Sequence, residues 1–163
     1  MAETFQLKMN QDLAERIRRH GVETFPHECC GALLGRDSVA GEVAGSLESK
    51  RSESLREVLD LFPLINRRDD SPRNRFAVTA DDVRDAEKAA RQRGLEIIGW
   101  YHSHPDHPAR PSQFDREHAW PWYSYVIVSV MSGTPAEMTS WRLNDDRQDY
   151  SPENIEILNR ARA

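Results

Sequence analysis

Cysteine is scarce in this sequence of 163 residues: the two that occur, Cys29 and Cys30, are neighbours. Adjacent cysteines rarely bridge each other, and the chain offers neither of them another cysteine as a partner. A fold held by disulfides is therefore not expected, and this absence is typical of a reducing cytoplasm. Because an apolar run follows at 31–34, we expect both side chains to be small buried groups, with a thiol nucleophile as the alternative.

Long apolar runs are also missing. No stretch approaches the roughly 20 residues of a transmembrane helix, and the start Met1-Ala2-Glu3-Thr4 lacks the basic and apolar regions of a signal peptide. Charge of a single sign is missing too, because 22 basic and 27 acidic residues are mixed along the chain and leave a net charge of −5. Nucleic-acid and membrane partners are therefore not expected. A cytoplasmic location is expected, as the cysteines already indicate.

The length predicts one domain, residues 1–163, large enough to bury a core without a structural metal. Helices are predicted at 10–21 and 79–94, the first with Asn10 as its N-cap and Gly21 as its stop. Strands are predicted at 31–34, 39–47, 58–62, 95–101, 123–131, 137–143 and, as an edge strand, 155–157. Segments 31–34 and 39–47 could form a hairpin. This order indicates an α/β fold with a mixed central β-sheet flanked by helices.

Arginine is concentrated in one polar stretch, at 66–75. The stretch contains Arg67, Arg68, Arg73 and Arg75 among acidic residues. Basic side chains that alternate with acids in a predicted loop are typical of a solvated surface. We therefore interpret this cluster as a solvent-exposed face of the protein, with an anion-binding site as the alternative.

Two histidines close the apolar strand predicted at 95–101. His102 and His104 follow it directly, and alternate residues of a strand face the same side, so both imidazoles can reach one metal ion. Asp115 adds a carboxylate eleven residues after His104. Catalytic zinc sites hold three protein ligands and leave the fourth position to water. The pattern therefore predicts a zinc hydrolase.

The stretch Ser112-Gln113-Phe114-Asp115 also has the form of a capping box that opens a helix. The two interpretations are compatible, because a helix that begins there would direct Asp115 back toward the strand end. The competing interpretation of the histidines is that they are packed or solvated without a ligand role. The remaining histidines show no comparable pairing: His20, His27, His107 and His118.

The spacing His102-x-His104, seven residues, Ser112, two residues, Asp115 resembles the signature of the JAMM (MPN+) metalloproteases. That family also carries a catalytic glutamate far upstream, and the segment 26–35 resembles the family's sequence there, with Glu28 on the catalytic position. The resemblance spans roughly residues 7–145 and is closest to small prokaryotic members. It implies a cytidine-deaminase-like arrangement of the sheet and helices.

The resemblance also implies the chemistry. Zn²⁺ would be held by His102, His104 and Asp115, Glu28 would carry the proton between water and leaving amine, and Ser112 would donate a hydrogen bond to the oxyanion. The substrate would be a ubiquitin-like or sulfur-carrier protein. Its peptide, isopeptide or carrier–cysteine amide bond would be cut after a Gly-Gly tail.

Three other classes are weighed against this one. A catalytically silent MPN-type scaffold would not need the five residues that are intact here. A zinc nucleobase deaminase needs His-x-Glu and a later Pro-Cys-x-x-Cys, and neither occurs. A structural zinc is usually closed by four Cys or His ligands. The sequence leaves open which carrier is cut, whether cysteine, a peptide or lysine is released, and the oligomeric state.

Overall fold

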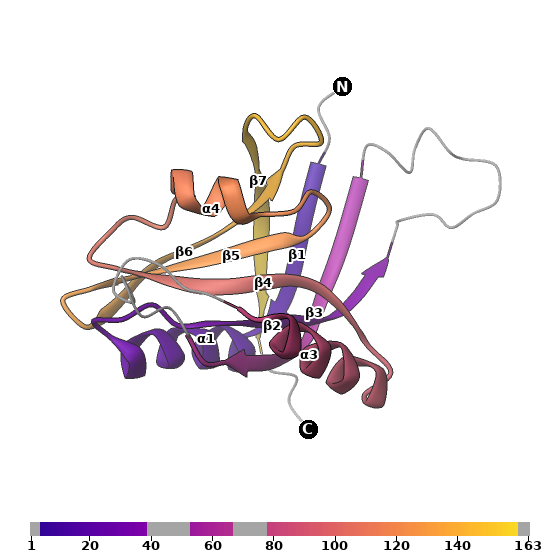
Figure 1. The fold of residues 1–163 in the computed structure, drawn as a ribbon, viewed down its shortest axis with the longest axis horizontal. Helices are drawn as coiled ribbons and strands as arrows, with labels where there is room; N and C mark the ends of the chain where they lie inside the picture. The colour runs from indigo at the N-terminus through magenta and orange to yellow at the C-terminus, as the bar shows by residue number, and fades with distance from the viewer. Residues whose placement is uncertain (1–3, 39–52, 67–77, 160–163) are drawn as a thin grey trace.

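The computed structural model describes residues 4–38, 53–66 and 78–159 (Figure 1). Three helices and seven strands occur in these segments. The helices are α1 (Gln11–Thr24), α3 (Ala80–Gln92) and α4 (Gln113–His118). The strands are β1 (Thr4–Asn10), β2 (Cys30–Ser38), β3 (Glu53–Leu64), β4 (Glu96–Pro105), β5 (Ser124–Met131), β6 (Thr134–Leu143) and β7 (Tyr150–Leu158). Among the described helices, none is long and apolar enough to cross a membrane.

The strands form a mixed sheet in the order β1-β3-β2-β4-β5-β6-β7, which closes into a barrel because β7 pairs with β1. The pairs β1–β3, β1–β7 and β4–β5 are parallel, and the other four pairs are antiparallel. The predicted mixed α/β fold is confirmed, but the sheet closes into a barrel, which differs from the predicted central sheet flanked by helices. The prediction of an edge strand at 155–157 is wrong, because β7 has a neighbour on each side.

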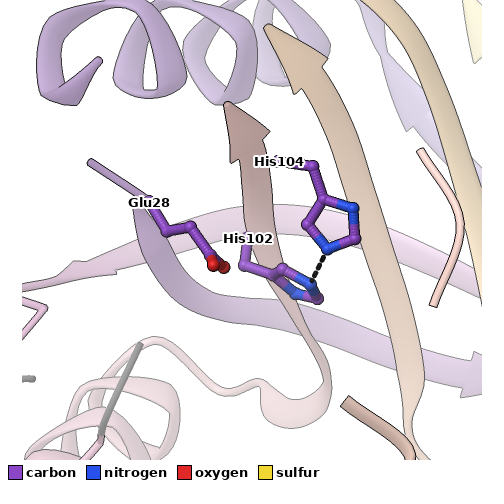
Figure 2. A group of neighbouring side chains, drawn as sticks. All are labelled: Glu28, His102 and His104. Carbon is purple, nitrogen blue, oxygen red and sulfur yellow. Dashed lines mark hydrogen bonds between the residues drawn. The ribbon is translucent and has the colours of Figure 1, made fainter. Parts of the chain in front are cut away.

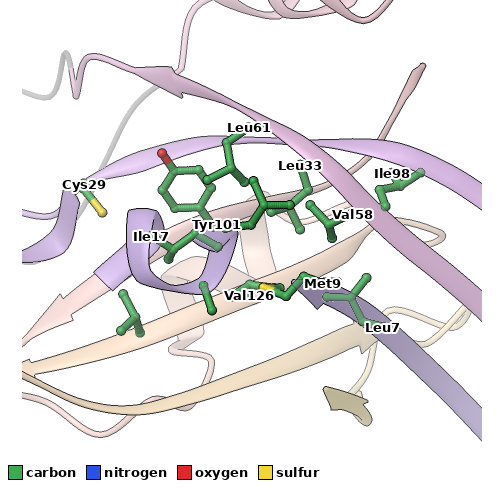
Figure 3. Close-up of a cluster of buried hydrophobic side chains, with 13 residues drawn as sticks. Leu7, Met9, Ile17, Cys29, Leu33, Val58, Leu61, Ile98, Tyr101 and Val126 are labelled. Carbon is green, nitrogen blue, oxygen red and sulfur yellow. The ribbon is translucent and has the colours of Figure 1, made fainter. Parts of the chain in front are cut away.

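Successive residues of β2 supply two separate cores. Leu33 packs with Ile17 of α1 and with residues of β1, β3, β4 and β5 in the larger core, part of which is drawn in Figure 3. Ala32 and Leu34 pack with Ala86 of α3 in a second cluster. Because alternate residues of a strand point to opposite faces, α1 and α3 cover opposite faces of the sheet around β2. Helices α3 and α4 contribute to one cleft, which Val83 and Phe114 both line.

Strand β1 is absent from the predicted elements, although its apolar residues Phe5, Leu7 and Met9 alternate with polar ones.

The predicted start of helix α1 is confirmed, since the Leu13 amide donates to the Asn10 side chain at 2.9 Å. The predicted stop at Gly21 is wrong, since α1 continues to Thr24. The expected strand at 39–47 and the arginine cluster lie outside the described residues.

Candidate metal centre

Strand β4 carries both histidines of the candidate site in the middle of the sheet. It pairs with β2 on one side and β5 on the other, so that His102 lies opposite Cys30 and Ile127. The two histidines are 1% and 8% exposed, and their Nε2 atoms are 3.1 Å apart (Figure 2). A strand held on both sides keeps the two imidazoles in a fixed relation to each other.

Helix α4 brings the carboxylate of Asp115 to the same point. Asp115 Oδ1 lies 3.3 Å from His102 Nε2, and Oδ2 lies 3.2 Å from His104 Nε2. Burial by itself raises the pKa of Asp115, but the charge of His102 and hydrogen bonds with both imidazoles outweigh burial and hold that pKa well below its usual range. Asp115 is therefore a carboxylate at neutral pH and offers its oxygens as ligands.

The capping box that the sequence predicts is present and orients this carboxylate. The Asp115 amide donates to Ser112 Oγ at 3.0 Å, and the Ser112 amide donates to Asp115 Oδ2 at 2.8 Å. The capping bond and the approach to His104 therefore share one oxygen. Because Ser112 Oγ accepts from the Asp115 amide, its own hydrogen stays free to be donated elsewhere.

The spacing of these atoms is close to that of the ligands of a tetrahedral zinc ion, with one oxygen of Asp115 near each imidazole. With metal–nitrogen bonds of about 2.05 Å, the ligand atoms of such an ion lie about 3.3 Å apart, close to the 3.1 to 3.3 Å found here. His104 Nδ1 lies 2.9 Å from the Pro108 carbonyl oxygen, which can accept a hydrogen bond from the ring. In the tautomer with its hydrogen on Nδ1, the ring directs the Nε2 lone pair toward a histidine nitrogen and a carboxylate oxygen. Such a meeting of acceptors is favourable only when a cation or proton lies among them.

Glu28 approaches the cluster from the segment between α1 and β2. Its side chain is 2% exposed, and its carboxylate points toward the His102 ring in Figure 2. One ligand atom from each of Glu28, His102 and His104 can be chosen so that all lie within 4.8 Å of one another. This separation allows a water molecule or a reacting group between Glu28 and the histidines.

The serine between the two histidines fixes the segment that carries Glu28. The Cys29 amide donates to Ser103 Oγ at 2.8 Å, and the Ser103 amide donates to the Cys29 carbonyl at 3.2 Å. On the other side, the Asn66 side-chain amide donates to the Glu28 carbonyl at 3.1 Å. The backbone on both sides of the Glu28 side chain is thus tied, in part to the strand that holds the histidines.

Two clefts meet at the candidate site. The first has a volume of about 430 Å³ and is lined by Glu28, His104 and Ser112. The second, of about 740 Å³, is reached by His102 and Asp115. Most of its remaining lining is aromatic, from Trp100, Phe114, His118, Trp120, Trp122, Tyr123 and Tyr125. The ligand atoms therefore lie between a small cleft with charged residues and a larger apolar one.

Trp122 of the aromatic cleft has an unusual backbone conformation. Its φ of 90° lies in a region that bulky side chains rarely adopt, and its side chain stays about half exposed. The buried Arg56 guanidinium lies 4.2 Å from the centroid of the Trp122 ring, and the Tyr123 ring packs edge-on against the Trp122 ring. Backbone strain that the surroundings maintain is concentrated at binding sites in proteins.

The buried cysteines are not nucleophiles. Both are 1% exposed. Burial raises the pKa of the Cys29 thiol and of the Cys30 thiol to about 12. The nucleophilic form of cysteine is the thiolate, which is then negligible at neutral pH. The expectation of small buried groups is confirmed.

Comparisons with known proteins identify the family. Residues 10–144 match the family described as "Prokaryotic homologs of the JAB domain". A desampylase of Haloferax volcanii is 31% identical over 129 residues, 76% of this chain and 81% of that protein. A BRCC36-like deubiquitinase of Mus musculus is 28% identical over 111 residues, 59% of this chain but only 38% of that protein. The chain therefore belongs to the prokaryotic JAB-domain homologues, within the JAMM family.

Two solved structures are similar to this chain in fold. The solution structure of a protein from Desulfitobacterium hafniense is similar with a TM-score of 0.75 and 29% identity, over 94% of both chains. A solution structure from Salinibacter ruber gives a TM-score of 0.67 and 40% identity, over 93% of this chain and 91% of that one.

The structure brings all five residues of the predicted site together, with Ser112 on the wall that Glu28 and His104 also line. Three contributors are absent from the sequence prediction: the Ser103 anchor, the Pro108 carbonyl and the aromatic cleft. A signal for the aromatic cleft was available, because Trp120, Trp122 and Tyr123 follow Asp115 within eight residues.

Proposed function

We propose that this protein is a zinc-dependent hydrolase that cuts the amide bond after the Gly-Gly tail of a ubiquitin-like or sulfur-carrier protein. The observation that carries the proposal is the meeting of His102, His104 and Asp115 at the spacing of zinc ligands, with Glu28 beside them. The names of the two relatives, a desampylase and a deubiquitinase, support a protein-modifier substrate.

The five residues have separate roles in this proposal. Zinc held by His102, His104 and Asp115 would supply a Lewis acid and lower the pKa of a bound water to about 7. Glu28 takes the proton of the attacking water and passes it to the nitrogen of the leaving amine. Ser112 donates the hydrogen that its capping bond leaves free to the oxyanion of the tetrahedral intermediate.

The aromatic cleft supports a protein tail as the acyl side of the substrate. Its volume of about 740 Å³ is enough for several residues, and it ends at His102 and Asp115. An extended tail with apolar side chains can lie along the tryptophans. The residues next to the scissile bond must then bring their backbone close to the buried His102 and His104, where glycine alone adds no side chain.

The glycine requirement tests the proposed function. Replacing the last glycine of a cleaved carrier by alanine should lower kcat/KM by about 2–4 kcal/mol, because displacement at the reacting carbonyl is penalised in the transition state. The measurement is kcat/KM by mass spectrometry of the released carrier, with zinc-loaded protein. The matched control is an alanine replacement several residues upstream in the tail, which should cost less. Equal cleavage of the alanine carrier or of an unrelated short peptide would make the protein a general peptidase.

Ser103 is expected to be a positioning residue for Glu28. Replacing Ser103 by alanine removes the acceptor of the Cys29 amide, so Glu28 should lose its alignment and kcat should fall about tenfold with zinc content unchanged. Ser140, a serine of β6 that is also buried and hydrogen-bonded, gives the control. The Ser140→Ala variant should lose similar stability, about 1 kcal/mol, without the loss of kcat. Equal kcat values in the two variants would leave Ser103 with a purely structural role.

A further inference from the structure

The position of Glu28 determines which cleft receives which half of the substrate, provided the proposed hydrolysis holds. A general acid has to come within hydrogen-bond distance of the nitrogen that it protonates. Glu28 lines the cleft of about 430 Å³ and is absent from the lining of the aromatic one. The leaving amine therefore belongs in the smaller cleft, and the carrier tail belongs in the aromatic cleft.

The smaller cleft has a cation that the proposed reaction does not use. Arg110 lines it together with His107, and Glu28 is the single acid in its lining. The Arg110 side chain is exposed. Among the described residues it makes no ion pair and no side-chain hydrogen bond. Its guanidinium is thus available to a group that enters with the substrate.

The loop that carries Arg110 is fastened to the sheet. Ser129 Oγ of β5 donates to the His107 carbonyl, and Thr139 Oγ1 of β6 donates to the Ala109 carbonyl. His104 Nδ1 faces the Pro108 carbonyl in the same loop at 2.9 Å. Three consecutive carbonyls are therefore held, and the backbone next to Arg110 is fixed relative to the candidate ligand His104. A cation on a fixed loop can select a charge at a defined distance from the scissile bond.

We propose that Arg110 binds the free α-carboxylate of the leaving group, so that the preferred substrate is a carrier joined through its Gly-Gly tail to a single α-amino acid. The amine and carboxylate of an α-amino acid are attached to the same carbon. With the amine next to Glu28, the carboxylate stays inside the cleft that Arg110 lines, where a planar guanidinium can bind both of its oxygens. A lysine ε-amine within a folded protein presents no carboxylate there.

Substrates that differ in one charge test this inference. One carrier is extended beyond Gly-Gly by alanine with a free carboxylate, a second by alaninamide, and a third is joined to the ε-amine of a lysine in a folded protein. The zinc-loaded wild type should cut the carboxylate substrate with a kcat/KM about tenfold above that of the carboxamide, and most of the difference should appear in KM.

The Arg110→Gln variant should reduce this preference to about twofold or less. Arg19→Gln is the matched control, because Arg19 is an exposed arginine of α1 that lines neither cleft, and it should keep the full preference. Melting temperatures measured alongside should agree among the three proteins, since both arginines are exposed.

Each other outcome has a distinct meaning. Equal cleavage of the carboxylate and the carboxamide, or an undiminished preference in Arg110→Gln, overturns the role of Arg110 and leaves the proposed hydrolysis intact. Cleavage of the lysine-linked carrier alone overturns the amino-acid leaving group in the same way. Failure of the zinc-loaded wild type to cut any of the three substrates contradicts the proposed function itself.

Discussion

Replacing Glu28 by glutamine is expected to lower turnover by about 10²-fold or more while the zinc content stays at one equivalent. Glutamine keeps the size of the side chain and its hydrogen-bonding ability, but it cannot accept the proton of the attacking water. The backbone contacts of this segment, from Cys29 to Ser103 and from Asn66 to the Glu28 carbonyl, involve no atom that the substitution changes. The fold around the site should therefore persist.

Two measurements on the same preparation test this prediction: kcat with a saturating carrier substrate, and zinc content by elemental analysis. Glu23→Gln is the control, because Glu23 is exposed near the end of α1 and its replacement should leave both values unchanged. The distances also permit Glu28 to be a ligand, together with His102 and His104. Zinc loss in Glu28→Gln would identify it as a ligand, and unchanged turnover would leave it a structural role only.

The sequence predicts that His102, His104, Ser112 and Asp115 lie near one another, because the geometry that joins them is local. His102 and His104 are adjacent on one face of one strand, and the capping box joins Ser112 to Asp115 within one helical turn. Strand period and helix capping are properties of a few consecutive residues. The upstream Glu28 is different, because 74 residues separate its neighbour Cys29 from Ser103, the anchor of that segment. The resemblance to the JAMM family predicts a role for Glu28, and no local pattern does.

The closure of the barrel depends on pairings that no local pattern specifies. Strand β1 pairs in parallel with β7, so that Leu7 lies opposite Ile155 across almost the whole length of the chain. The mixed polar and apolar sequence of β7 is typical of an edge strand, yet it pairs both with β6, which precedes it in the chain, and with the distant β1. The role of Gly21 also depends on tertiary packing that no local pattern specifies. A Cβ built there would approach Val130 Cγ2 at 3.0 Å and Ser103 Cβ at 3.3 Å, so this glycine allows α1 to pack closely against β5 and β4.

Removal of a proposed zinc ligand is expected to abolish stable metal binding. His104→Ala and Asp115→Ala should each retain well below one equivalent of zinc after dialysis, because two remaining protein ligands leave a tetrahedral ion half coordinated. At a zinc concentration of about 100 times the dissociation constant, the wild type should gain about 2.7 kcal/mol of stability. For a chain of this size that gain corresponds to a rise of roughly 5–10 °C in melting temperature. The two variants should lack this rise.

The controls separate the loss of a ligand from the loss of a helix cap. Asp115→Ala also removes the bond from the Ser112 amide, which costs about 1 kcal/mol with or without metal. Ser112→Ala removes the capping oxygen and leaves the Asp115 carboxylate, so this variant should be less stable and still bind one zinc. His27→Ala, at an exposed histidine, should leave zinc content unchanged. Retention of a full equivalent in both His104→Ala and Asp115→Ala would show that the metal is held elsewhere, and that the acceptor atoms meeting at β4 are joined by a proton.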